Sequence, residues 1–227
     1  MSQYISVNNI FHSIQGSGKY MGHPAIFVRL TGCVAPLCPF CDEPSAQTAG
    51  TPFTILQLQQ KIEEYSCKYV IFTGGEPVLQ ADELAPLFIW LDRYDYTVGW
   101  EVSLKAYSKI FIQRWADRVT ICPKYIDGCW QIHDGWKDKW GRINLVSRSF
   151  RDISWKFLIK DWADYNLCRN FMSCNWIQPE NVWLMPYGAD RETSIENTKR
   201  VIEIAKMTGY KVAPRLHILI YDKQKGV

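Results

Sequence analysis

The chain has 227 residues, 47% of them hydrophobic, which is enough to bury a substantial core as one domain spanning 1–227. Its 26 basic and 23 acidic residues give a formal net charge of +3, too balanced for a surface that binds nucleic acid. No apolar segment reaches the roughly 18 residues of a membrane span, and the opening residues lack a secretory leader, so we expect a cytoplasmic protein that acts on a small molecule.

Short β-rich runs alternate with helical patterns, which is typical of βα units around a mainly parallel sheet. Helices are predicted at 54–65, where Thr54 and Gln57 form a capping box, at 82–93, and at 193–208, where Thr193 and Glu196 form a second one. Strands are predicted at 5–10, 25–30, 69–73, 97–102, 119–122, 155–159, 181–185 and 211–220. Roughly six βα units fall short of the eight that close a full barrel, so we expect an α/β fold, a partial, open (βα)6-type TIM-like barrel.

One stretch, 125–151, has tryptophans and basic residues where a helix between two strands would be expected. We interpret it as an irregular surface excursion. It would serve as structural padding or a dimer contact, or else as a substrate lid or a docking site for an electron donor.

Three cysteines lie close together in the run GCVAPLCPFCDE, at Cys33, Cys38 and Cys41, directly after the strand predicted at 25–30. Three thiolates can hold three irons of a cubic 4Fe-4S cluster and leave the fourth iron open to a ligand. Spacing alone also permits zinc with a distant fourth ligand, such as Cys67 or His12. The isolated cysteines suit small buried hydrophobic positions: Cys67, Cys122, Cys129, Cys168 and Cys174.

A second motif, TGGEP at 73–77, follows the apolar strand predicted at 69–73. Glycines let a backbone be approached closely, and Glu76 stands beside them, so this strand end suits an amino-acid-like ligand. Active sites of barrel folds lie at the carboxyl ends of the strands, and both motifs are predicted to fall there.

The pairing of an open-iron cluster with a Gly-Gly strand end resembles the radical S-adenosylmethionine superfamily. The opening FHSIQGSGKYMGHPAIFVRLTGC is similar to that of the 7-carboxy-7-deazaguanine synthases, which read close to F-x-S-x-Q-G-E-G-x-x-x-G-x-P-x-x-F-x-R-x-x-G-C. The likeness continues through WEVS at 100–103, CPK at 122–124, WKF at 155–157, LMP at 184–186 and the closing RLHILIYDKQKGV.

The resemblance implies a lyase that contracts 6-carboxy-5,6,7,8-tetrahydropterin to 7-carboxy-7-deazaguanine with loss of ammonia, for queuosine or modified DNA. It implies a 4Fe-4S cluster, S-adenosyl-L-methionine and Mg²⁺ as cofactors, a flavodoxin- or ferredoxin-type electron donor, and a homodimer. The metal-binding residues would be Cys33, Cys38, Cys41 and Glu43. S-adenosylmethionine would bind at Gly74, Gly75, Glu76, Glu101, Ser103, Cys122 and Lys124. The pterin would bind at Gln15, Ser17, Arg29, Thr73 and His217, with Arg29 on the substrate carboxylate and His217 on the last predicted strand.

The chain departs from the family pattern near these sites. Ser17 stands in place of a substrate-binding glutamate and removes an acceptor for the pterin nitrogens. Glu43 replaces a threonine that ligates Mg²⁺, and a carboxylate is the stronger ligand for a hard cation. Cys122 replaces a serine, and the cysteine spacing C-x4-C-x2-C is one residue longer than the superfamily's commonest spacing.

Two other functions remain open from the residues. A glycyl-radical-enzyme activase would share the cluster and the Gly-Gly strand, but would give no reason for Gln15, Arg29 and His217 to occur together. A non-catalytic zinc-binding module would be colourless. Taken singly, these three residues also suit a turn, a strand edge and a buried core histidine, and only their joint pattern indicates a substrate site.

Overall fold

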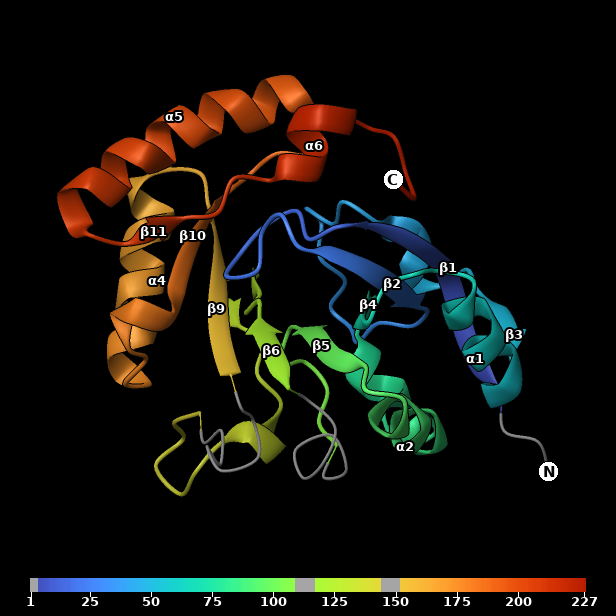
Figure 1. The fold of residues 1–227 in the computed structure, drawn as a ribbon. Coiled ribbons are helices and arrows are strands. Elements are labelled where there is room, and N and C mark those ends of the chain that lie inside the picture. Colours follow the sequence, from blue (N-terminus) through green and yellow to red (C-terminus); the bar gives the residue numbers. More distant parts are fainter. Residues whose placement is uncertain (1–3, 109–116, 144–151) are drawn as a thin grey trace.

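The computed structural model describes residues 4–108, 117–143 and 152–227 (Figure 1). Its main feature is a nine-stranded sheet in the order β11-β10-β9-β6-β5-β4-β2-β1-β3. These strands are β1 (Ile5–Ile14), β2 (Pro24–Leu30), β3 (Thr51–Phe53), β4 (Tyr69–Gly74), β5 (Thr97–Val102), β6 (Arg118–Ile121), β9 (Asp152–Ile159), β10 (Val182–Pro186) and β11 (Lys211–Val212).

The pairing from β2 through to β11 is parallel, whereas β1 pairs antiparallel with both β2 and β3. The strands β3 and β11 lie at opposite ends of the sheet order, so the barrel is open. The predicted α/β fold with a mainly parallel sheet is confirmed.

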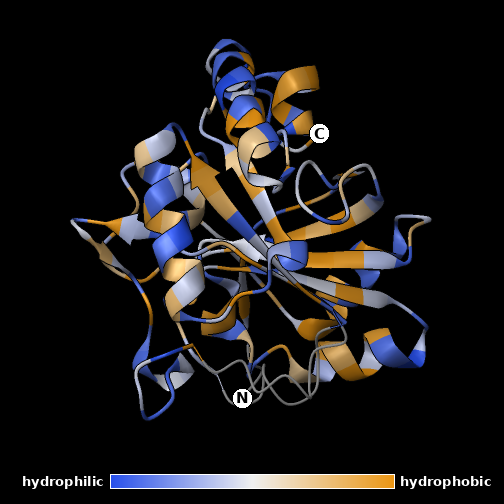
Figure 2. Ribbon diagram, turned by 90° about the vertical axis from the view of Figure 1, so that its left-hand side faces the viewer, coloured by the Kyte–Doolittle hydropathy of each residue, from blue (hydrophilic) through white to orange (hydrophobic). Residues whose placement is uncertain are grey.

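Helices connect the strands and cover the outside of the sheet (Figure 1). They are α1 (Ile55–Glu63), α2 (Ala85–Arg93), α4 (Trp162–Cys174), α5 (Arg191–Thr208) and α6 (Leu216–Tyr221), with 3-10 turns at Pro44–Gln47, Pro77–Gln80, Asp134–Trp136 and Pro179–Asn181. Helix α2 packs on β5, α4 on β9, and α5 on β10 and β11. Hydrophobic residues dominate the strands, whereas the helices carry hydrophilic stretches (Figure 2).

An aromatic cluster holds the central strands to α2. Phe72 on β4, Phe88 on α2 and Trp100 on β5 are almost fully buried, and their ring centroids lie 5.1 to 5.4 Å apart. Burying one such side chain stabilises the fold by about 2 to 3 kcal/mol. This packing holds β4 and β5 in place and so positions the residues at their carboxyl ends.

The C-terminal segment differs from its prediction, because the strand expected at 211–220 ends at Val212. Pro214 interrupts it, and the amide of Leu216 donates to the carbonyl of Gly16 at 2.7 Å, which starts α6. His217 therefore lies on a helix and not on the last strand.

Helix α4 was not predicted, although its signals are present in the sequence. Asp161 caps it by accepting hydrogen bonds from the amides of Ala163 and Asp164. Tyr165, Cys168, Phe171 and Met172 form its buried face.

Part of the 125–151 stretch is anchored to the core. The strands β7 (Tyr125–Ile126) and β8 (Cys129–Trp130) form a separate antiparallel pair. The buried indole of Trp136 donates to the carbonyl of Ala106 at 2.7 Å. Residues 144–151 of this stretch lie outside the described residues.

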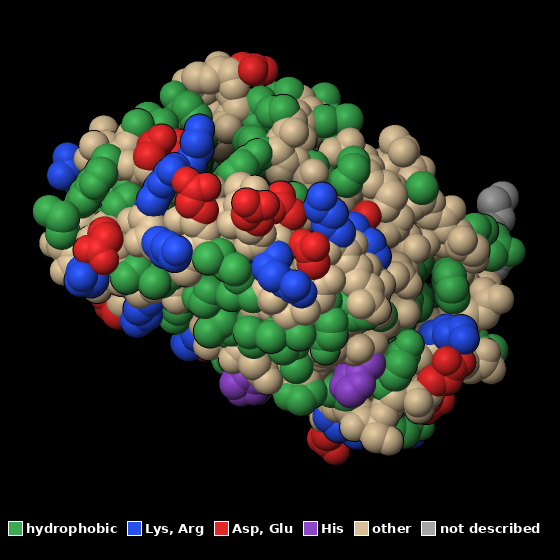
Figure 3. Space-filling model, turned by 90° about the horizontal axis from the view of Figure 1, so that it is seen from above, with side chains coloured by type: hydrophobic (Ala, Val, Ile, Leu, Met, Phe, Trp, Pro, Cys, Tyr) green, Lys and Arg blue, Asp and Glu red, His purple; other side chains and the backbone are tan. Residues whose placement is uncertain are grey.

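No helix among residues 4–108, 117–143 and 152–227 combines the length and hydrophobicity that a bilayer-spanning helix needs. On the face seen from above, basic and acidic side chains are intermixed (Figure 3). On α5, Arg200 pairs with Glu196 and Lys206 with Glu203.

Candidate active site

A cavity of about 280 Å³ lies at the carboxyl ends of the central strands. It gathers most of the residues singled out from the sequence: Gln15, Ser17, Arg29, Glu43, Thr73, Gly74, Gly75, Glu101, Ser103, Cys122, Lys124 and His217. Cys33, Cys38, Cys41 and Glu76 do not line this cavity. The predicted substrate residues and all the predicted S-adenosylmethionine residues except Glu76 thus line one cavity.

The two glycines of TGGEP are required by the protein's own backbone. A Cβ on Gly74, which has φ 133°, would lie 2.1 Å from the carbonyl oxygen of Leu30, and one on Gly75 would lie 1.8 Å from that of Gly32. The Gly75 amide donates to Leu30 at 3.0 Å, and the Glu76 amide donates to Gly32 at 2.7 Å. From the sequence, we expected a ligand to approach these glycines closely. At these atoms the close neighbour is the backbone of Leu30 and Gly32, so the glycines hold the TGGEP motif against the start of the loop that carries the cysteines.

Glu76 is buried behind this strand end. Its Oε2 accepts hydrogen bonds from the backbone amide of Ser103, at 2.9 Å, and from the Ser103 hydroxyl. Its Oε1 has no hydrogen-bond partner within the described residues. Burial raises the pKa of Glu76, and the two Ser103 bonds, the nearby backbone amide of Val78 and the charge of Lys124 only partly oppose the rise. An unpaired buried carboxylate oxygen suits a cationic donor such as an amino group.

The three clustered cysteines are half-buried free thiols on the loop that follows β2. Burial raises the pKa of the Cys38 thiol, while Lys124 and Lys105 act in the opposite direction. Within the described residues, no three His, Cys, Asp or Glu side chains converge on one metal position. A cubic cluster would contact each of the three cysteines through a different iron.

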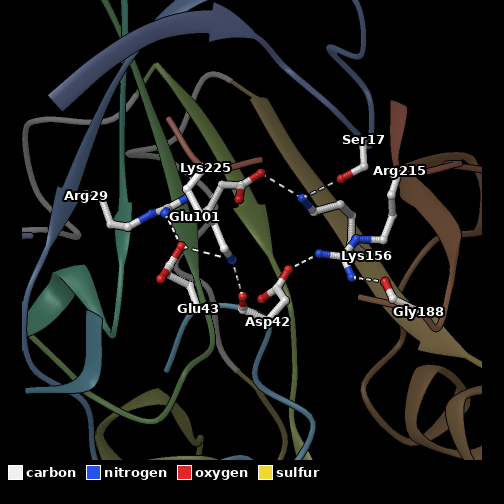
Figure 4. Close-up of polar contacts among 9 residues, drawn as sticks. All are labelled: Ser17, Arg29, Asp42, Glu43, Glu101, Lys156, Gly188, Arg215 and Lys225. Atoms are coloured by element: carbon white, nitrogen blue, oxygen red, sulfur yellow. Dashed lines mark hydrogen bonds and ion pairs between the residues drawn. The ribbon is translucent and has the colours of Figure 1, made fainter. Parts of the chain in front are cut away.

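Glu43 lies between two cations (Figure 4). Its Oε2 is 2.5 Å from Nη1 of Arg29 and 3.2 Å from Nζ of Lys225, and its Oε1 accepts from the Ser45 hydroxyl at 2.6 Å. Burial alone would raise the pKa of Glu43, but Ser45, Arg29 and Lys225 more than offset this and lower it. Glu43 is therefore an ionised carboxylate at the cavity edge.

A second charged group, formed by Lys156 and Glu101, lines the same cavity (Figure 4). Nζ of Lys156, on β9, donates to Glu101 Oε1 at 2.6 Å and to the Ser17 hydroxyl at 3.1 Å. Nε2 of Gln15 donates to the same Glu101 oxygen at 2.7 Å. Burial would raise the pKa of Glu101, but Lys156 and Gln15 more than offset it, so the pKa lies below its usual value. Lys156 was missed as a site residue, although a lysine inside the apolar strand DISWKFLI is a detectable signal.

The C-terminal segment closes one side of the cavity. A Cβ on Gly16 would lie 1.8 Å from Nδ1 of His217, so the glycine makes room for the imidazole. Burial, with Arg215 and Lys156 nearby, lowers the pKa of His217 to about 4, so the ring is neutral at neutral pH. The buried Arg215, also missed from the sequence, donates to the carbonyl of Gly188 at 2.6 Å and pairs with the Asp42 carboxylate. It thereby ties α6 to the residue that follows Cys41.

A further cavity of about 420 Å³ is lined by residues of the cysteine loop and of the β7–β8 pair. Phe40, Tyr125, Trp130 and Tyr187 give it aromatic walls, and Pro39 and Pro123 also line it. Phe40 lies between Cys38 and Cys41 in the chain, so this cavity adjoins the cysteine loop.

Comparisons with known proteins agree with one another. No protein-family profile matches the chain. It is 38% identical over 190 residues to a 7-carboxy-7-deazaguanine synthase of Methanospirillum hungatei, covering 83% of this chain and 76% of the relative. It is 29% identical over 231 residues to the protein of that name in Hyperthermus butylicus, covering 97% and 94%. The crystal structure of QueE from Escherichia coli shares the fold, with a TM-score of 0.70, 19% identity, and coverage of 92% of this chain and 93% of that one.

Proposed function

The chain belongs to the 7-carboxy-7-deazaguanine synthase family, and we propose that the residues of its cavity carry out that family's reaction. The reaction is the radical-mediated ring contraction of 6-carboxy-5,6,7,8-tetrahydropterin to 7-carboxy-7-deazaguanine with loss of ammonia, in deazapurine biosynthesis. One observation carries the assignment of residues: a single cavity joins the predicted substrate residues to the TGGEP strand end.

Cys33, Cys38 and Cys41 would hold the 4Fe-4S cluster as thiolates. The unpaired Oε1 of Glu76 would accept the amino group of S-adenosylmethionine. The adjoining cavity of about 420 Å³, with its aromatic walls, would take the adenine of S-adenosylmethionine. When bound, the cluster and S-adenosylmethionine supply the radical that removes hydrogen from the substrate.

Glu43 and Arg29 would hold the carboxylate end of the pterin. Arg29, which pairs with Glu43 at the cavity, would make a charge-assisted bond to the substrate carboxylate. Mg²⁺ keeps several waters and binds through one or two carboxylates plus the substrate, which is compatible with Glu43 as the single acidic ligand. Lys225 contacts the same Glu43 oxygen, so we propose that it withdraws when Mg²⁺ binds.

His217 would face the substrate as a neutral imidazole, which donates at one ring nitrogen and accepts at the other. The protein's part in the reaction is to orient the substrate and to exclude water, since the cofactors supply the radical chemistry. The buried Arg215 supports this by holding α6 over the cavity.

We further propose that the enzyme works in the cytoplasm as a single-domain homodimer with a flavodoxin- or ferredoxin-type electron donor. The family resemblance supports the dimer and the donor. The single sheet that contains all but two of the described strands supports the one-domain organisation.

The test is anaerobic reconstitution with iron and sulfide, followed by incubation with the carboxypterin, S-adenosylmethionine and a reductant. We expect 5′-deoxyadenosine together with 7-carboxy-7-deazaguanine, identified by mass. An activase would form 5′-deoxyadenosine without the deazaguanine product, and a zinc module would form neither.

A further inference from the structure

Position 17 and Glu101 share one buried cation. Nζ of Lys156 contacts the Ser17 hydroxyl at 3.1 Å and Glu101 Oε1 at 2.6 Å, although the two residues are far apart in sequence (Figure 4). The side chain of Lys156 is only 4% exposed. A glutamate placed at position 17 would therefore have within reach the same ammonium that Glu101 now neutralises.

The hydrogen bonds among Gln15, Glu101 and Lys156 leave one acceptor and one donor free to bind a ligand. Glu101 receives both Lys156 and Gln15 on Oε1, so Oε2 accepts no hydrogen bond within the described part of the chain. An ammonium has three N–H donors, and Lys156 uses two of them, on Glu101 and Ser17. One carboxylate oxygen of Glu101 and one ammonium hydrogen of Lys156 remain, on two paired residues that both line the cavity.

The amino-oxo edge of a pterin presents the complementary groups. Its 2-amino group and the adjacent ring N–H donate, and its 4-oxo group accepts. We propose that Glu101 and Lys156 together bind this edge of the pterin. Glu101 would supply the carboxylate that Ser17 lacks. This inference rests on the proposed function, because it takes the carboxypterin as the substrate.

The contacts favour the substrate over S-adenosylmethionine as the ligand of Glu101. Glu101 is bonded to Gln15 and Lys156, and its charge also acts on Arg29. By contrast, Ser103, two residues further along the chain, donates a hydrogen bond to Glu76 at the TGGEP strand end. The two sides of the β5 end thus separate a substrate group from a cofactor group.

The test compares wild type, E101Q and the double variant S17E/E101Q, all reconstituted anaerobically and matched in cluster content. Dissociation constants for the carboxypterin and for S-adenosylmethionine are measured separately by calorimetry. We expect E101Q to weaken pterin binding by about 10- to 100-fold and to leave S-adenosylmethionine binding within about twofold. The double variant, which restores a carboxylate beside Lys156, should recover most of the lost pterin affinity.

A pterin analogue without the 2-amino group gives a second arm. Wild type should bind this analogue more weakly than it binds the substrate. The E101Q substitution should reduce the affinity for the analogue by a smaller factor than it reduces the affinity for the substrate. Unchanged pterin affinity in E101Q, with or without weaker S-adenosylmethionine binding, would overturn the inference, and so would a double variant that recovers nothing. Product formation by wild type separates these outcomes from a failure of the proposed function, which would show as an absence of 7-carboxy-7-deazaguanine.

Discussion

The contact between Lys225 and Glu43 predicts a competition between the C-terminal tail and Mg²⁺. Nζ of Lys225 lies 3.2 Å from the Glu43 oxygen that also meets Arg29, and its side chain is 58% exposed. Replacing Lys225 with glutamine removes a cation that any metal at Glu43 must displace. K225Q should therefore bind Mg²⁺ more tightly than wild type.

The size of this effect follows from the exposure of the pair. Solvent-screened ion pairs contribute about 0.5 to 1 kcal/mol, which corresponds to about a two- to fivefold change in an equilibrium constant. K225Q should lower the Mg²⁺ concentration that half-saturates turnover by that factor, and calorimetric titration of Mg²⁺ into the substrate-bound enzyme should show the same shift.

The control is K223Q, because Lys223 lies on the same tail and makes no ion pair with Glu43. It should leave Mg²⁺ affinity unchanged. Unchanged or weaker Mg²⁺ binding in K225Q, or an equal gain in K223Q, would refute the reasoning.

Three further predictions follow from other contacts. C38A should lose the brown chromophore and most of its iron after anaerobic reconstitution, and full iron content would show that Cys38 is not a ligand. G75V should lower the melting temperature of the protein even without ligands, because its side chain meets the Gly32 carbonyl, and a wild-type melting temperature would contradict this steric account. Folding lowers the pKa of His217 from about 6.5 in the unfolded chain to about 4, so the neutral imidazole stabilises the folded protein above pH 6.5. This stabilisation is lost as the pH falls from 6.5 to 4. In denaturant titrations, the free energy of unfolding should fall by up to about 3 kcal/mol between those pH values. The fall should be smaller in H217Q, and equal pH profiles of wild type and H217Q would contradict this prediction.

Local patterns predicted much of the fold because they follow from neighbouring residues. The capping box at Thr54, the Gly209 helix end and the strand ahead of TGGEP all occur as expected. The capping box predicted at Thr193 is wrong, because α5 begins at Arg191 and Asp190 caps it by accepting a hydrogen bond from the Thr193 amide. The strand predicted at 211–220 is mostly wrong, because HILIY reads as a β-rich run while Pro214 and the bond from Leu216 to Gly16 start a helix. Tertiary contact overrode local propensity there.

The candidate site shows the same division between local and long-range information. Most of the site residues that the motifs identified line the cavity, because most of these motifs lie at or near the end of a strand. The pairing of Lys156 with Glu101, and of Arg215 with Asp42, joins residues far apart in sequence. No spacing rule encodes such pairs, so they required the structure.

The central claim is that one cavity brings the carboxypterin to the radical chemistry supported by the cysteine loop. The most direct measurement uses substrate deuterated at C6 and follows deuterium into 5′-deoxyadenosine during a single turnover of the anaerobically reconstituted enzyme. The account predicts one deuterium in 5′-deoxyadenosine, with 7-carboxy-7-deazaguanine formed in matching amount. Unlabelled 5′-deoxyadenosine, or labelled 5′-deoxyadenosine without the deazaguanine product, would contradict it.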